Sequence, residues 1–210
     1  MKVSKRAWLV ASVIFLILLI DQITKIWIKT NMSLYENTEI TSWFYIYFTE
    51  NPGMAFGWEF FDKVFLTLFR LIFSGLILYY LITLVKRKYR IGYVICISLI
   101  FAGAVGNIID CLFYGVLFGE STPVQVASFL PESGGYAPLL KGKVVDMLYF
   151  PLIKTTWPSW VPYYGGESFV FFRPIFNIAD SAISVGIAIL LLFYRKDLSH
   201  SLEKKEKTDE

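Results

Sequence analysis

The sequence predicts an all-α integral membrane protein with four transmembrane helices. Three observations predict this class: 56% of the 210 residues are hydrophobic, only 18% are charged, and the apolar residues gather in four long runs. A soluble globular surface needs more charge than this, so an ordinary soluble enzyme and a disordered chain are both excluded. The length favours one domain, covering residues 1–210.

The four predicted spans cover about residues 7–28, 64–85, 91–117 and 175–194. A helix of about 20 apolar residues is long enough to cross a hydrocarbon core of roughly 30 Å. The first run follows a basic stretch, as the apolar part of a secretory signal peptide does. No small-x-small cleavage site follows Ile20, and the apolar run continues to Trp27. We therefore expect a retained helix.

The basic residues predict the orientation of the spans. More than half of the twenty lie before the first span, between the second and third at 86–90, or after the fourth. The positive-inside rule then places both termini and the 86–90 turn in the cytoplasm. We expect outer loops at about 29–63 and 118–174, and a solvated cytoplasmic tail at 195–210 with no assigned function.

Both outer loops are rich in aromatic residues. Residues 40–48 form a β-rich aromatic run before a turn at Asn51-Pro-Gly53, which favours a small extracytoplasmic sheet on the membrane surface. The second loop places seven Trp, Tyr and Phe residues between 157 and 172 among prolines and glycines. This pattern is typical of a segment resting in the lipid headgroup layer.

Few chemistries remain for an enzyme of this composition. The single histidine, His200, lies in the polar tail, which excludes Ser-His-Asp and Cys-His catalysis and argues against a His-ligated metal. Cys96 and Cys111 lie in apolar surroundings and offer no disulfide framework. We expect no metal and no cofactor. The net charge of +3 is too even a balance for a nucleic-acid partner.

Four aspartates are predicted to share one depth in the membrane. Asp21, Asp110 and Asp180 lie in spans near the outer boundary, and Asp146 belongs to an apolar run of the second outer loop. An ionisable residue in a membrane span costs several kcal/mol and usually marks function or a buried pairing. Hydrolysis by this chain would have to use these carboxylates.

Two asparagines accompany the acids at helical spacing. Asn107 lies three residues before Asp110, and Asn177 three residues before Asp180, so each pair shares a helix face. Such groups also join helices by hydrogen bonds alone, and for Asp21 and Asp110 both interpretations stand equally. For Asp146 and Asp180 we favour catalysis. Two aspartates sharing a proton suffice for peptide hydrolysis, but spacing does not say which two of the four pair.

Five segments resemble the signature of one family, lipoprotein signal peptidase or signal peptidase II. They are Asp21-Gln-Ile-Thr-Lys25, Asn51-Pro-Gly-Met-Ala-Phe56, Gly106-Asn-Ile-Ile-Asp110, Val144-Val-Asp146 and Phe176-Asn-Ile-Ala-Asp180. The resemblance implies an aspartic endopeptidase of the bacterial cytoplasmic (inner) membrane, with a four-helix membrane domain and an extracytoplasmic β-cradle that fits the aromatic first loop. Such an enzyme removes the signal peptide from diacylglyceryl-modified prolipoproteins, cutting just before the lipid-modified cysteine.

The resemblance also implies roles for single residues. The catalytic pair maps onto Asp146 and Asp180. The supporting or substrate-binding residues map onto Asp21, Lys25, Asn51, Gly53, Asn107, Asp110 and Asn177. The partners implied are prolipoprotein substrates, membrane lipid and the inhibitor globomycin. We expect a monomer whose active site lies near the outer leaflet.

The sequence departs from the family pattern in two ways. Cys111 stands where the third segment usually has Arg, so that position is non-essential or another cation, Arg70 or Arg173, takes its place. The stretches 119–142 and 154–173 are longer than is usual in the family. The first could gate the substrate, contact another protein or be a tolerated insertion.

A rival interpretation is a non-enzymatic transporter or assembly subunit whose intramembrane acids form a proton or cation path. Transport favours acids spread across the membrane. Here they crowd towards one side, which favours the peptidase.

Overall fold

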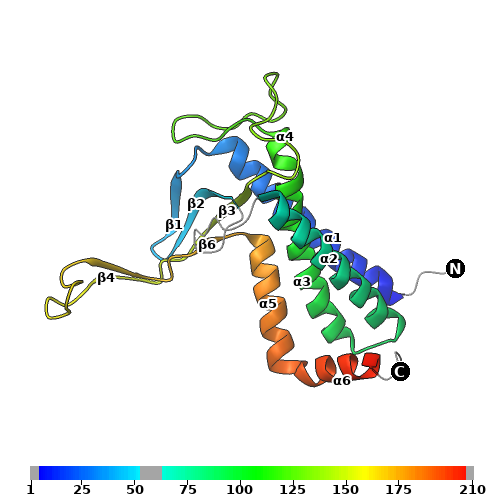
Figure 1. Cartoon of the computed structure of the whole chain (residues 1–210). Helices are drawn as coiled ribbons and strands as arrows, with labels where there is room; N and C mark the ends of the chain where they lie inside the picture. The colour runs from blue at the N-terminus through cyan, green and yellow to red at the C-terminus, as the bar shows by residue number, and fades with distance from the viewer. Residues whose placement is uncertain (1–4, 53–62, 207–210) are drawn as a thin grey trace.

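The fold is a bundle of helices with a small sheet at one end and a helix lying across the other (Figure 1). The computed structural model describes residues 5–52 and 63–206. The end of the bundle opposite the sheet contains the first residues of α1 and the last residues of α2 and α6. The described chain therefore starts and finishes at one end, and the sheet lies at the other.

Three helical stretches are long and apolar enough to cross a membrane. They are α1 (Lys5–Asn31), α2 (Lys63–Lys86) and the continuous run Ile91–Leu117. This run consists of α3 (Ile91–Ile109), the π-helical turn η1 (Asp110–Tyr114) and α4 (Gly115–Leu117). Their outward faces expose large apolar side chains such as Phe15 and Ile72, as a surface in contact with lipid would.

The fourth predicted span is shorter than expected. Helix α5 covers Ile178–Phe193, and 16 residues reach only about 24 Å at 1.5 Å per residue. The helix begins only after Asn177, because this residue has extended backbone angles and caps the helix. The two residues before it, Ile175–Phe176, form strand β6. A fourth span results only if α5 is counted together with α6 (Arg195–Glu206), which is bent from it by 85°.

The first part of the tail expected at 195–210 forms helix α6, in which a few side chains are packed against the bundle while most are exposed. Leu198 packs against the core cluster of α2 and α3, and Ser201 is buried. The Ser201 hydroxyl lies 2.5 Å from the hydroxyl of Tyr80 and 3.1 Å from that of Tyr93. The first part of the tail is therefore packed under the bundle.

Two small antiparallel sheets make the chain more mixed than the predicted all-α class. The first sheet has the order β1-β2-β3-β6, with β1 at Asn37–Thr41, β2 at Phe44–Asn51 and β3 at Val144–Tyr149. Strands β4 (Ile153–Thr156) and β5 (Ser168–Phe171) form the second sheet, which projects sideways as an arm (Figure 1). The aromatic run 40–48 lies in the first sheet, as predicted.

Helix α3 lies at the centre of the bundle and packs against α1, α2 and α5. Two glycines let its neighbours approach. A Cβ atom on Gly103 would lie 2.2 Å from the carbonyl oxygen of Ala179 in α5. One on Gly106 would lie 2.7 Å from Asp21 Oδ2 in α1. Small residues of this kind bring membrane helices into close contact, and here they bring the acids of three helices together.

We predict that Gly103→Ala destabilises the protein by about 1–3 kcal/mol, because the added methyl group meets backbone that cannot move aside. The matched control is Gly75→Ala on α2, where an added Cβ has no atom within 4 Å. Thermal unfolding in detergent should show a lower midpoint for Gly103→Ala and an unchanged or slightly higher one for Gly75→Ala. Equal midpoints would contradict the close α3–α5 contact.

Candidate active site

Asp146 owes its direction to the alternation of side chains along β3. Its neighbours Val145 and Met147 belong to the buried apolar cluster that fixes the sheet onto the helix ends. Successive side chains of a strand point to opposite faces, so Asp146 points away from this cluster. Its side chain is directed to the start of α5 and the residue is only 4% exposed.

Asn177 links Asp146 with Asp180. As the N-cap of α5, its side-chain oxygen accepts a hydrogen bond from the Asp180 backbone N–H at 2.9 Å. Its side-chain nitrogen donates to Asp146 Oδ1 at 2.7 Å. One amide therefore caps the first turn of α5, which carries Asp180, and also contacts the carboxylate of Asp146.

Asn107 on α3 holds Asp180 from the opposite side. Its nitrogen donates to Asp180 Oδ1 at 2.7 Å, and its oxygen accepts from Asn177 at 3.1 Å. The same oxygen accepts from Lys25 Nζ at 2.9 Å. The two asparagines predicted from their spacing thus lie in contact with both aspartates.

Lys25 is fully buried between two carboxylates. Its Nζ lies 2.9 Å from Asp21 Oδ2 and 2.8 Å from Asp110 Oδ2, and all three side chains have no exposed surface. With Asn107, these carboxylates give the ammonium one acceptor for each of its three hydrogens. A buried charge is tolerated only when it is paired and hydrogen-bonded in this way.

Asp21 and Asp110 each hold a second element in place. Asp21 Oδ1 accepts from the backbone N–H of Ala179 in the first turn of α5 at 2.9 Å. Asp110 Oδ2 accepts from the N–H of Val145, next to Asp146, at 3.3 Å. Of the two interpretations left open by the sequence, this geometry favours the one in which these acids join the elements of the fold.

Gln22, which was not predicted as a site residue, also joins the two carboxylates. Its Nε2 donates to Asp21 Oδ2 and to Asp110 Oδ1, each at 3.0 Å. Its Oε1 accepts from the hydroxyl of Tyr114 at 3.2 Å. The available signal was an amide next to Asp21 within an apolar run.

The pKa of Asp146 is raised to about 7. Burial of the carboxyl group is the main cause, and the negative charge of Asp180 adds to it. The positive charge of Lys25 and the hydrogen bonds from Asn177 and Asn51 act in the opposite direction. Asp146 can therefore carry a proton near neutral pH.

Asn51 lies beside Asp146. It is the last residue of β2, it pairs with Val144 at the start of β3, and its side chain hydrogen-bonds Asp146. Gly53, the other supporting residue implied for this segment, lies outside the described residues.

A second buried cluster of charges, also missed, lies one turn further along α1. Lys29 forms an ion pair with Glu50, and its Nζ donates to Ser121 Oγ at 2.8 Å. Ser121 in turn donates to Glu50 Oε1 at 3.0 Å, and Lys143 Nζ lies 3.0 Å from Glu50 Oε2. The ring of Tyr136 lies 4.9 Å from Lys29 Nζ and 5.2 Å from Lys143 Nζ. The 119–142 stretch is thereby attached to β2 next to Asn51.

Glu50 is ionised in this cluster. Burial alone would raise its pKa, but the ammonium groups of Lys29 and Lys143 outweigh burial and hold the pKa below its usual value.

Arg70 lies beside Cys111. Its Nη1 lies 3.3 Å from Cys111 Sγ, so a guanidinium from α2 reaches the position where the family usually has Arg. Arg173, the other candidate, lies exposed between β5 and β6. A functional substitution by Arg70 stays a prediction.

An apolar groove of about 290 Å³ adjoins the site. It is lined by residues of α1, β2, β3 and the start of α5, among them Ile23, Trp27, Ile46, Met147, Leu148 and Ile178. The groove thus reaches β3 and the start of α5, the two elements that carry Asp146 and Asp180, although neither aspartate lines it. Among the described residues, no group of three or more His, Cys, Asp or Glu side chains is placed to share a metal ion.

Comparison with known proteins relates this arrangement to one family. Residues 13–195 match the family model described as Signal peptidase (SPase) II. A lipoprotein signal peptidase of Porphyromonas gingivalis is 50% identical over 198 residues, covering 94% of this chain and 87% of that protein. One of Amoebophilus asiaticus is 36% identical over 213 residues, covering 98% and 86%.

Two solved structures are also similar. Both are described as a bacterial membrane enzyme structure obtained by the in meso method, at 2.3 Å and 1.9 Å resolution. The first has a TM-score of 0.59 and 25% identity, covering 91% of this chain and 90% of that one. The second has a TM-score of 0.57 and 26% identity, covering 88% and 93%.

We predict that Lys25→Met destabilises the fold by about 3–5 kcal/mol, because it leaves two buried carboxylates without their cation. The combined variant Asp21→Asn, Lys25→Met and Asp110→Asn removes all three charges and should recover much of this loss. Thermal unfolding in detergent, or the yield of folded protein, compares the two variants. If the combined variant is no more stable than Lys25→Met, the charges are not what holds these elements together.

Proposed function

Because the chain belongs to the signal peptidase II family, we propose that it removes the signal peptide from diacylglyceryl-modified prolipoproteins, cutting just before the lipid-modified cysteine. One observation carries the catalytic assignment: Asn107 and Asn177, whose amides contact each other, donate to the carboxylates of Asp180 and Asp146, which come from separate elements. The protein is a multi-pass protein of the bacterial inner membrane.

In the proposed reaction the two aspartates divide the work of acid and base. Protonated Asp146 donates its proton to the scissile carbonyl oxygen, in keeping with a pKa of about 7. Ionised Asp180, held by Asn107, takes a proton from the attacking water. Water oxygen bonds to the carbonyl carbon and gives a tetrahedral intermediate. When the C–N bond breaks, Asp180 gives its proton to the leaving nitrogen and Asp146 recovers its own from the hydroxyl group.

The surroundings of the dyad support an apolar, membrane-held substrate. The groove is lined mostly by apolar side chains, some of which come from β3 and the start of α5, the two elements that carry the dyad. We propose that the substrate arrives laterally with its signal helix among the spans, while its lipid chains stay in the bilayer. A lipid anchor fixes the depth of the cysteine, so a dyad at the same depth needs little recognition of side chains.

The proposed orientation puts both termini in the cytoplasm and the site near the outer leaflet. The start of α1, the 86–90 turn and α6 share one end of the bundle, and the dyad lies at the other. The basic residues at the first of these ends support this direction. Globomycin binding and a monomeric state remain part of the proposal.

We predict that Asp146→Asn and Asp180→Asn each lower the rate of signal-peptide release by a factor on the order of 100 or more, since neither amide can transfer the proton. The assay uses purified protein in detergent with a diacylglyceryl-modified prolipoprotein. Asp197→Asn is the control, because Asp197 lies in α6 and pairs with Arg90 far from the dyad.

An unmodified precursor in the same assay tests the role of the lipid and should be cleaved poorly. Near-full activity of a folded dyad variant would show that the catalytic pair has been assigned to the wrong residues. Asp21 and Asp110 would then have to be tested. Efficient cleavage of the unmodified precursor would contradict the proposal that the lipid anchor selects the substrate by fixing the depth of its cysteine.

We further predict that kcat/KM falls as the pH rises through about 7. The pKa of Asp146 is raised, so its proton is present below this pH and lost above it. Initial rates between about pH 5 and 9, with thermal unfolding recorded over the same range, separate a change in activity from a change in stability. A flat profile across neutral pH would exclude Asp146 as the acid.

A further inference from the structure

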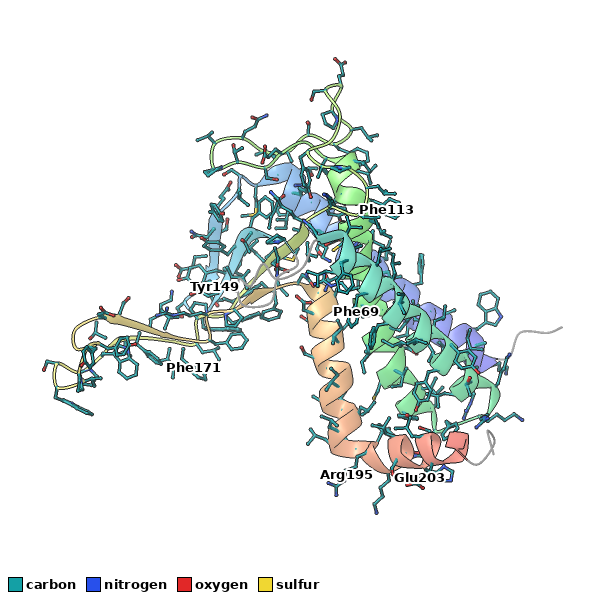
Figure 2. All side chains as sticks on the ribbon, viewed as in Figure 1. Phe69, Phe113, Tyr149, Phe171, Arg195 and Glu203 are labelled. Carbon is teal, nitrogen blue, oxygen red and sulfur yellow. The ribbon has the colours of Figure 1, made fainter. Side chains whose placement is uncertain are left out.

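The hairpin of β4 and β5 is not used by the proposed reaction. Together with its turn, residues 153–171 form an arm that extends sideways from the sheet end of the bundle, crosswise to the helices (Figure 1). Figure 2 shows Phe171 on this arm, well apart from Phe69 on α2. Nothing in the proposed function requires such an extension.

The register of the arm gives it two different faces. Ile153 pairs with Phe171, and Thr155 pairs with Phe169, so these four side chains share one face. The ring of Trp157 meets that of Phe169 edge-on, with 4.8 Å between their centres, and extends this apolar face as far as the exposed Glu167, whose carbonyl accepts from the Trp157 N–H. The other face carries Lys154, Val170, Thr156 and Ser168. The hairpin is therefore amphipathic.

At the base of the arm, the face that carries Lys154 contacts polar and charged side chains of the first sheet. Lys154 Nζ donates to the hydroxyl of Tyr45 on β2 at 2.8 Å and lies 4.2 Å from the centre of its ring. The Tyr45 hydroxyl donates to Glu39 Oε2 at 3.0 Å. These charged groups are exposed and need water. The apolar face points the other way, and Ile153 and Phe171 on it are both about half exposed.

The tip of the arm has the composition of a membrane interface. Residues 155–166 contain no charged side chain. Trp160 is 80% exposed and Tyr163 is 97% exposed. Trp and Tyr are the residues enriched where the headgroups meet the hydrocarbon. A two-stranded hairpin alone is at best marginally stable in water, so this arm needs a surface to lie on.

The attachment of the arm fixes its height relative to the membrane. The chain leaves β5 at Phe171, enters β6 at Ile175 and starts α5, the helix of the candidate fourth span, at Ile178. The arm therefore begins within a few residues of a membrane helix. A bilayer is the surface that a multi-pass protein always has at this level.

We propose that the arm is an interfacial membrane anchor that lies in the headgroup layer of the leaflet on the dyad's side. Its face of Ile153, Trp157, Phe169 and Phe171 is turned to the acyl chains. Lys154 and the hydroxyls of Thr156 and Ser168 are turned to water. The ligand is the phospholipid surface itself, and the anchor is independent of peptide cleavage.

The test measures the depth of single nitroxide labels in phosphatidylethanolamine–phosphatidylglycerol vesicles containing the whole protein. Labels are attached to Phe171→Cys on the apolar face, Thr156→Cys on the polar face, and Val124→Cys. Val124 is 94% exposed on the 119–142 stretch and serves as the aqueous control. The natural Cys96 and Cys111 are buried, and labelled wild type gives their background.

We expect the label at 171 to collide more often with oxygen, and those at 156 and 124 with a water-soluble nickel chelate. A matched pair extends the test: with the label at Tyr163→Cys, Phe171→Glu should raise the tip towards water, while Thr156→Glu should leave its depth unchanged. Equal nickel accessibility at 171 and 124 would show an arm in water. Exclusion of both reagents at 171 would show an arm packed on protein. Either result overturns the proposal.

Discussion

The arrangement of this protein depends on one buried cation. The ammonium of Lys25 has no water to contact, so it is tolerated only where protein oxygens replace water. Those oxygens belong to Asp21 on α1 and to Asn107 and Asp110 on α3. The charge therefore fixes the rotation of α3 against α1 more strictly than apolar packing could, because lipid offers helices little driving force to choose one rotation over another.

The fixed charge orients the site through its carboxylate partners and through two asparagines. Asp21 reaches the first turn of α5, and Asp110 reaches the backbone of β3. Asn107 and Asn177 then join Lys25 to Asp180 and Asp146. The oxygen of Asn107 accepts from Lys25, so its nitrogen is left to donate to Asp180. The nitrogen of Asn177 donates to the same oxygen, so the cation determines which way both asparagines point. The aspartates are thereby held in place without a positive charge directly on Asp146, whose proton remains available near neutral pH.

The sequence predicts most of the site because its residues lie in short segments with a helical or alternating pattern. Asp180 and Asn177 share the start of a helix, and Asp146 alternates with apolar neighbours, so local rules suffice. The start of α5 was misplaced because Ile175 and Phe176 are apolar and continue the run, while only the cap at Asn177 separates strand from helix. Lys29, Glu50 and Ser121 were missed because they are far apart in sequence and each alone is an ordinary polar residue. Loop length gives no sign of such contacts.

The attachment of the 119–142 stretch limits how this protein can be recombined. Ser121 satisfies both members of a buried ion pair, and Tyr136 lies against two ammonium groups. Replacing the stretch by a shorter loop from another protein would leave Lys29 and Glu50 short of partners in a place where water is scarce. A chimaera would have to exchange Lys29, Glu50 and Lys143 together with the loop. What looks like an interchangeable surface insertion is thus part of one structural unit that includes the strand leading to Asn51.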